Sequence, residues 1–215
     1  MEQYKCESLF DLRHTLARDA IRGEYAWEVP GMLSEIIVGL GQTLDRAEWE
    51  NPAPEVWIAR TARLEEGVTV KGPAIIGADT EVRAGAYLRG GVLIGRGCVV
   101  GHATEIKNSL LFDGAKAPHF NYVGDSVLGY GVHIGAGTVL SNIRCDKEKI
   151  VVRATPPVST LLRKLGAILG DGCEVGCSCV LNPGTLLGRG CTVMPLSSVC
   201  GVWREGSRIT ASRGR

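Results

Sequence analysis

The chain has 215 residues, with 24 basic and 23 acidic side chains and a formal net charge of +1 at pH 7. This length accommodates one main domain with a smaller appendage. The charge balance gives no overall attraction to nucleic acid or to an anionic membrane, and no apolar run approaches the roughly 20 residues that cross a bilayer. We therefore expect neither nucleic acid nor a membrane as a partner.

Residues 1–52 predict a short helical cap. The opening MEQYKCESLF has no apolar core of a signal peptide, which predicts a cytoplasmic protein. Helical spacing links Leu9, Leu12, Leu16 and Ala20. Pro30 is expected to open a second helix whose apolar residues are Leu33, Ile36, Ile37 and Leu40. Residues 51–54, NPAP, are expected to link this cap to the next domain. The cap is expected to cover one end of that domain.

From Ile58 onward an aliphatic residue recurs every six positions, which is the strongest pattern in the chain. The first run is Ile58, Leu64, Val70, Ile76, Val82, Leu88, Ile94, Val100 and Ile106. It continues with two five-residue steps as Leu111, Ala117, Val123, Leu128, Ile134 and Leu140. After an interruption it returns as Leu169, Val175, Leu181, Leu187, Val193 and Val199.

The position four residues after the aliphatic one is usually small. Examples are Ala74, Thr80, Ala86, Cys98, Thr104, Cys173, Cys179 and Cys191. One large and one small inward residue per hexad fits short parallel strands stacked coil upon coil. Four of the eight cysteines therefore occupy positions that require a small side chain. We expect reduced thiols and no bound metal.

This hexad pattern resembles the left-handed parallel β-helix of the hexapeptide-repeat acyltransferases, an all-β fold. In that fold three hexads make one triangular coil of about 18 residues. The resemblance implies a β-helix domain over residues 53–201, with a loop insertion at 143–166 and a basic C-terminal tail at 202–215.

Stacking residues about 18 apart brings polar side chains together at the corners of the predicted coils. Arg89 and Lys107 fall at the same corner of successive coils, with Ser141 and Asn142 two coils further. His119 shares its position with Ala136 on the next coil. Two stacked cations repel each other unless an anion neutralises them, which favours a binding site, although solvated corner residues remain the alternative.

Three segments add a more specific resemblance: EIK at 105–107, KAPHFNYVGD at 116–125 and IGAGTVLSN at 134–142. They resemble the acetyltransferase half of a bifunctional enzyme that acetylates glucosamine-1-phosphate and then makes UDP-N-acetylglucosamine. RKLGAILGDG at 163–172 is closer to archaeal sugar-1-phosphate nucleotidylyltransferase/amino-sugar acetyltransferases. The resemblance covers roughly residues 56–200.

The resemblance implies roles for individual residues. His119 would be the general base. The acceptor sugar phosphate would contact Arg89, Lys107, Tyr122, His133, Asn142, Lys147 and Lys149. Acetyl-CoA, the co-substrate, would contact Ala136, Cys177 and Pro195.

The chain departs from that family at several positions. His133 replaces an asparagine, Pro118 replaces a glycine before the histidine, and Cys177 and Pro195 replace small or hydroxyl residues. Residues 1–50 are too short for a nucleotidylyltransferase domain and carry no glycine-rich nucleotide-binding loop. We therefore expect acetyl transfer without nucleotidylyltransferase activity.

The expected function is N-acetyl transfer from acetyl-CoA to the amine of an amino-sugar phosphate or sugar nucleotide. The expected assembly is a homotrimer whose sites lie between subunits, and loop 143–166 is expected to reach a neighbouring subunit. One alternative is a regulatory protein that binds a sugar nucleotide without turnover. Another is a metal-dependent hydratase of the carbonic-anhydrase type. That class uses three histidines on zinc, and His102, His119 and His133 do not match the close pair that it shows.

Overall fold

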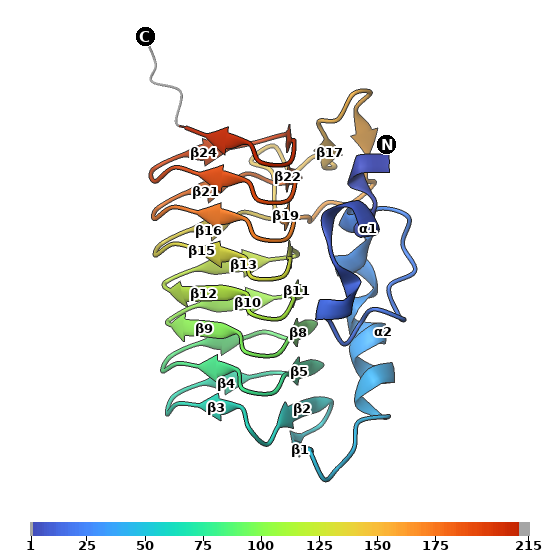
Figure 1. The fold of residues 1–215 in the computed structure, drawn as a ribbon, viewed down its shortest axis with the longest axis vertical. Helices are drawn as coiled ribbons and strands as arrows, with labels where there is room; N and C mark the ends of the chain where they lie inside the picture. Colours follow the sequence, from blue (N-terminus) through green and yellow to red (C-terminus); the bar gives the residue numbers. More distant parts are fainter. Residues whose placement is uncertain (1, 211–215) are drawn as a thin grey trace.

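The computed structural model describes residues 2–210 and forms a left-handed parallel β-helix with a helical segment along one side (Figure 1). Each complete coil contributes one strand to each of three sheets of parallel-paired strands, which we call sheets I, II and III in chain order. The predicted fold is therefore confirmed.

Sheet I carries the first strand of each coil. Its members are β1 (Trp49–Ala53), β2 (Val56–Ala59), β5 (Ala74–Ile76), β8 (Val92–Ile94), β11 (Ser109–Leu111), β14 (Val127–Leu128), β19 (Ala167–Leu169), β22 (Thr185–Leu187) and β25 (Val202–Trp203). The strand β1 runs antiparallel to β2 and so pairs the edge of the first coil. The residues predicted as a linker thus form part of a strand.

Sheets II and III complete the coils. Sheet II comprises β3 (Arg63–Leu64), β6 (Glu81–Val82), β9 (Val99–His102), β12 (Lys116–His119), β15 (His133–Ile134), β20 (Glu174–Val175), β23 (Thr192–Val193) and β26 (Arg208–Ile209). Sheet III comprises β4 (Thr69–Val70), β7 (Tyr87–Leu88), β10 (Glu105–Lys107), β13 (Tyr122–Gly124), β16 (Val139–Leu140), β21 (Val180–Leu181) and β24 (Ser198–Val199).

The hexad residues form the core of the β-helix. Those from Ile76 to Val199 are buried, and the three before Ile76 pack against them at the open first coil. The small positions are buried too, including Cys98, Cys173, Cys179 and Cys191. Burial raises the pKa of the Cys98 thiol to about 12. Its place as a small, unreactive core residue agrees with the sequence prediction.

The β-helix continues beyond the predicted boundary at residue 201. Val202 and Trp203 of β25 pair with β22, and Ile209 of β26 pairs with Val193. Leu187 pairs with Trp203, so this coil has 16 residues, whereas the other coils have 17 or 18 apart from the one with the insertion, and the six-residue pattern loses phase there. The predicted tail thus begins inside the β-helix, and its residues 211–215 lie outside the described residues.

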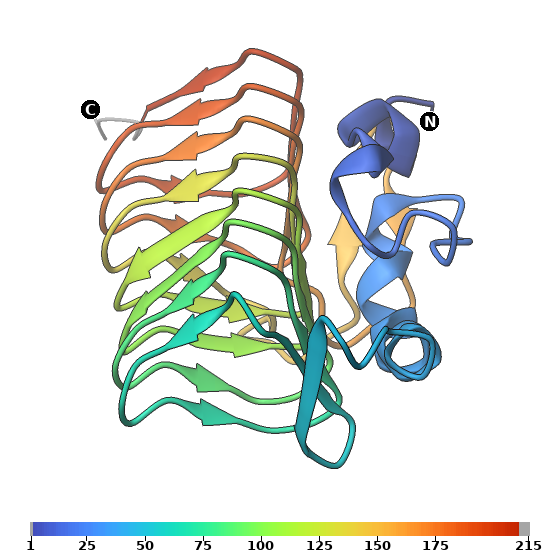
Figure 2. The ribbon, with the colours of Figure 1, turned by 60° about the horizontal axis from the view of Figure 1, so that its bottom comes forward.

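The N-terminal segment covers a side of the β-helix and not an end (Figure 2). It contains η1 (Glu2–Tyr4), α1 (Cys6–Leu9), η2 (Leu12–His14), η3 (Ala26–Glu28) and α2 (Val29–Gly41). Its apolar side chains pack on the outward residues of sheet I, among them Ile75, Leu93, Leu110, Val127 and Ile168. The predicted end cap is therefore corrected to a side cover.

Only the second of the two predicted N-terminal helices forms as expected. α2 begins at Val29 with Pro30 in its first turn. No continuous helix runs from residue 9 to residue 20, because the Asp171 carboxylate accepts the Asp11 N–H at 2.6 Å and Leu9 O accepts the Asp171 N–H at 3.0 Å. These bonds to the β-helix hold the chain extended after Leu9.

None of the helices in residues 2–210 combines the length and apolar character that a bilayer crossing requires.

Candidate functional site

His119 lies at the corner between sheets II and III, at the end of β12. Its backbone pairs with His102, one coil earlier, and both side chains are exposed. The same register continues on the next three coils through Ala136, Cys177 and Pro195. The predicted base and the three predicted acetyl-CoA residues thus form one column along this corner.

His102 is a neighbour to which the sequence reasoning gave no catalytic role. Its Nδ1 lies 2.7 Å from the carbonyl oxygen of Ala84. A carbonyl only accepts hydrogen bonds, so this contact places a proton on Nδ1. The 17-residue spacing between His102 and His119, one coil step, is the sequence signal that pairs them.

Two bulky side chains are exposed along the same corner. Phe120 is 59% exposed and Leu196 is 76% exposed, and their backbones have φ of +51° and +61°. Between them the corresponding corner residues are Gly137 and Ser178. Large residues rarely adopt positive φ, and they do so where the surrounding structure dictates it. Because Phe120 lies before and Leu196 after the Ala136–Cys177 part of the column, exposed apolar side chains flank that part on both sides.

The predicted acceptor residues Lys107 and Asn142 meet at the corner between sheets III and I. They meet around Asp125, a residue that the sequence reasoning missed. Lys107 Nζ donates to the two carboxylate oxygens of Asp125 at 3.0 and 3.1 Å, and Asn142 Nδ2 donates to Oδ2. Asp125 ends the YVGD segment, directly after the residues of β13. This position at a predicted corner was the signal in the sequence that could have identified it.

Arg89 and Tyr122 flank this cluster on the outer side of sheet III. Arg89 Nη1 donates to Glu105 Oε1 at 2.7 Å, and Glu105 pairs in register with Tyr122. Burial raises the pKa of the Tyr122 hydroxyl, and the negative charges of Glu105 and Asp125 add to this effect. The hydroxyl therefore stays protonated near neutral pH and can donate a hydrogen bond.

The two stacked cations are in the predicted positions, but carboxylates of the same chain neutralise them. Arg89 is paired with Glu105 and Lys107 with Asp125. Formal charges at this corner therefore cancel. The sequence argument that repulsion between the cations calls for an external anion is wrong.

Within residues 2–210, His133 and the two lysines of the loop insertion form no side-chain hydrogen bond or ion pair with this cluster. His133 lies on sheet II, where its Nδ1 is 3.0 Å from Glu174 Oε2, and it lines a hollow of about 600 Å³ with Lys116 and Tyr130. Lys147 and Lys149 are exposed on the insertion.

The loop insertion leaves the coil next to the Asp125 cluster. It starts after Asn142, forms the antiparallel hairpin β17 (Val151–Val152) and β18 (Val158–Ser159), and returns at Gly166. Ile150, Val152 and Leu165 are buried in the apolar cluster that the N-terminal segment and the outward residues of sheet I form. The insertion is therefore anchored at its base, while its lysines face outward.

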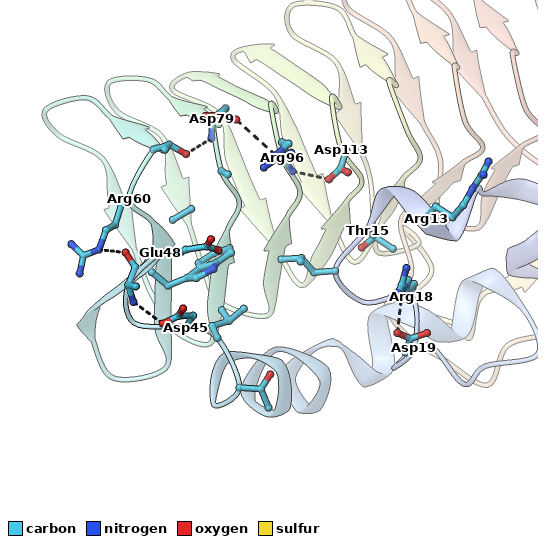
Figure 3. Close-up of a pocket in the computed structure, with 18 residues that line it drawn as sticks. Arg13, Thr15, Arg18, Asp19, Asp45, Glu48, Arg60, Asp79, Arg96 and Asp113 are labelled. Atoms are coloured by element: carbon cyan, nitrogen blue, oxygen red, sulfur yellow. Dashed lines mark hydrogen bonds and ion pairs between the residues drawn. The ribbon is translucent and has the colours of Figure 1, made fainter.

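A hollow of about 900 Å³ lies elsewhere (Figure 3). It separates the N-terminal segment from the corner between sheets I and II. Two pairs of its charged groups face each other: Arg96 lies 3.8 Å from Asp79, and Arg18 lies 3.0 Å from Asp19. No residue singled out from the sequence as catalytic or as a ligand contact lines it.

Within residues 2–210, no three His, Cys, Asp or Glu side chains are grouped so that they could hold a metal ion. The cysteines of this range are all free thiols, of which Cys145, Cys177 and Cys200 are exposed.

Comparison with known proteins supports the resemblance stated above. The family model described as the GMPPB C-terminal domain matches residues 70–164. A bifunctional sugar-1-phosphate nucleotidylyltransferase/acetyltransferase of Sulfurisphaera tokodaii is 32% identical over 159 residues, which cover 65% of this chain and 40% of the relative. A bifunctional protein GlmU of Methanococcus maripaludis is 36% identical over 103 residues, covering 48% of this chain and 25% of the relative.

A solved structure of a putative acetyltransferase of Bacillus cereus aligns with 65% of this chain and 69% of its own, at 16% identity and a TM-score of 0.38. That similarity is too low to support an argument about activity. The chain spans well under half the length of the two relatives named above. The hexad core, the β-helix and these matches together identify the chain as one that resembles the acetyltransferase domain of GlmU-type bifunctional enzymes.

Proposed function

We propose that this chain is an N-acetyltransferase that moves the acetyl group of acetyl-CoA to the amine of an amino-sugar phosphate or sugar nucleotide. The observation that carries the proposal is the arrangement of two corners around sheet III. His119 lies at one edge of this sheet, and the cluster of Lys107, Asp125 and Asn142 lies at the other. A sugar on the outer face of sheet III would have its amine near the histidine and its anionic group near the cations.

The chemistry requires a base, because a protonated amine is no nucleophile. In the proposed reaction the imidazole of His119 takes a proton from the acceptor amine as its nitrogen attacks the thioester carbonyl. Collapse of the tetrahedral intermediate breaks the C–S bond, and coenzyme A leaves as a thiol after receiving that proton from the His119 imidazolium, which restores the base. No covalent enzyme intermediate is needed.

The oxyanion of that intermediate needs a hydrogen-bond donor. Among the backbone hydrogen bonds of residues 2–210, the N–H of Gly137 donates to His119 O at 3.0 Å, whereas the N–H of Ala136 donates to none. A half-buried peptide N–H one coil from the base fits this role. The neighbouring exposed Phe120 and Leu196 offer apolar surface to the arm of coenzyme A.

The positions of His133, Lys147 and Lys149 favour an assembly. Their side chains lie on sheet II and on the insertion, away from the Asp125 cluster of the same chain. All of them could serve one site only if that site combined surfaces of neighbouring subunits. We therefore include a homotrimer with shared sites in the proposal.

The test is an acceptor screen. Purified protein is incubated with acetyl-CoA and each of a panel of amino-sugar-1-phosphates and amino-sugar nucleotides, and release of free thiol is followed. The expected result is thiol release that depends on one acceptor class, with one acetyl group gained by that acceptor in mass spectrometry. Reactions without acceptor measure thioester hydrolysis.

The same screen separates the alternative of a binding protein without turnover. The pairing of both cations with internal carboxylates is the observation that favours this alternative. It predicts that calorimetry detects binding of a sugar nucleotide while no panel member releases thiol above the hydrolysis control.

A further inference from the structure

Asp125 is the point at which three successive coils are joined by side chains. Its carboxylate, with 6% of the side chain exposed, accepts hydrogen bonds from Lys107 Nζ at 3.0 and 3.1 Å and from Asn108 Nδ2 at 2.8 Å. Asn142, from the following coil, also donates to it. Four donor bonds leave the two carboxylate oxygens fully engaged. The carboxylate therefore fixes an ammonium and a carboxamide relative to each other.

The backbone around Asp125 is built to allow this approach. Its φ of +47° lies in the left-handed region that Asp tolerates better than most residues. A Cβ on the preceding Gly124 would come within 2.7 Å of the Tyr122 hydroxyl and 2.8 Å of Asn142 Nδ2. Glycine at 124 thus lets both groups reach the corner.

Asp125 also fixes both ends of the loop insertion through hydrogen bonds. Asp125 O accepts the N–H of Gly166 at 2.8 Å, and Asn142 O accepts the N–H of Leu165 at 3.1 Å. The start of the insertion is held by the Asp125 carboxylate through Asn142, and its end is held by the Asp125 carbonyl. One residue therefore determines where the insertion leaves and rejoins the β-helix.

Two other corner aspartates, Asp113 and Asp171, accept their hydrogen bonds from backbone N–H groups, and Asp171 also lies 3.9 Å from Arg189 Nη2. Asp113 Oδ1 accepts the N–H of Arg96 at 2.7 Å, and Asp171 accepts the N–H groups of Tyr130 and Asp11 at 2.8 and 2.6 Å. The Asp125 carboxylate instead binds side chains, two of which the sequence assigned to the acceptor. This difference separates a structural corner aspartate from one that serves a site.

We propose that Asp125 is a positioning residue for the acceptor: it orients the Lys107 ammonium and the Asn142 carboxamide. This inference rests on the proposed acetyl transfer. Asp125 itself contacts no substrate, because its oxygens are already occupied by these donors.

The test is a double-mutant cycle of Asp125→Asn and Lys107→Met, with Asp113→Asn as the matched control. If Asp125 acts through Lys107, Asp125→Asn lowers kcat/KM for the acceptor about 10- to 100-fold and leaves KM for acetyl-CoA unchanged. The double variant then falls no further than Lys107→Met alone, since coupled residues are not additive. The double variant lacks both charges. Comparing its melting temperature with that of Asp125→Asn shows whether the unpaired Lys107 ammonium disturbed folding in the single variant.

Three outcomes overturn the inference while acetyl transfer stands: additive losses, equal losses of acceptor and acetyl-CoA kinetics, or an equal effect of Asp113→Asn. If the unaltered protein turns over no acceptor, the proposed function fails. The same variants are then compared by their calorimetric binding of glucosamine-1-phosphate. Unchanged binding in Asp125→Asn, or no binding to the unaltered protein, then overturns the positioning role too.

Discussion

At the scale of single residues, the two cations of the candidate site differ in surroundings. The Arg89 side chain is 42% exposed and its partner Glu105 is 33% exposed. The Lys107 side chain is 24% exposed and its partner Asp125 only 6%. An exposed ion pair contributes little to stability, whereas loss of one partner leaves a buried charge without compensation.

These surroundings predict different results for two substitutions. Arg89→Ala and Lys107→Met should each raise KM for the acceptor about 10- to 100-fold, because each removes a charge-assisted contact. Only Lys107→Met should also lower the melting temperature, because Asp125 would keep a buried negative charge. Steady-state kinetics and thermal denaturation measure the two effects. A shift of KM for acetyl-CoA in place of that for the acceptor would mean that the two ends of the site are reversed.

At the scale of elements, the N-terminal segment packs on the β-helix through an apolar cluster that includes a buried aromatic pair. The rings of Phe10 and Phe112 stack with centroids 4.9 Å apart, and both side chains are buried. Phe112 follows β11 of sheet I, whose outward residues the segment covers. This contact lies on the opposite side of the coil from His119 and the corner between sheets II and III.

Phe112→Ala should therefore destabilise the protein by about 3–5 kcal/mol, the usual effect of emptying a buried aromatic site. Chemical denaturation measures this change. The matched control is Phe120→Ala, at a side chain 59% exposed, which should leave the unfolding free energy within about 0.5 kcal/mol. Equal losses in both variants would contradict the assignment of Phe112 to the interface with the cover.

The sequence predicts the β-helix well and its cover poorly, for a physical reason. Hexad positions are set by local spacing, so the stacking of Lys107 on Arg89 and of Ala136 on His119 follows from counting. The extended chain after Leu9 depends on bonds to Asp171, 160 residues away along the chain. The role of Asp125 was missed because its donors come from two other coils. Contacts between distant residues leave no periodic signal.

At the scale of the whole molecule, the proposed homotrimer explains why the predicted acceptor residues are divided between surfaces. His119 and Lys107 flank sheet III, while Lys147 and Lys149 are exposed on the insertion. The apolar residues of the insertion are buried on their own chain. The lysines, however, remain available to a neighbour.

Subunit mixing tests this sharing. His119→Ala and the double variant Lys147→Ala/Lys149→Ala should each be nearly inactive, and both should have the light-scattering mass of a trimer. Mixed at equal amounts under subunit exchange, they should recover about a quarter of the unaltered activity, because about three quarters of random trimers contain both chains and each of these has one intact site of three. Sites contained within one chain would recover nothing.

The most direct test of histidine-dependent acetyl transfer is thiol release by His119→Ala, measured beside the unaltered protein with saturating acetyl-CoA and the acceptor found in the screen. General-base catalysis contributes about 10²- to 10⁴-fold, so the variant should lose at least about 100-fold in kcat. Its melting temperature and oligomeric mass should not change, because the His119 side chain is exposed at a corner. A folded His119→Ala protein that releases thiol at the unaltered rate would contradict the account.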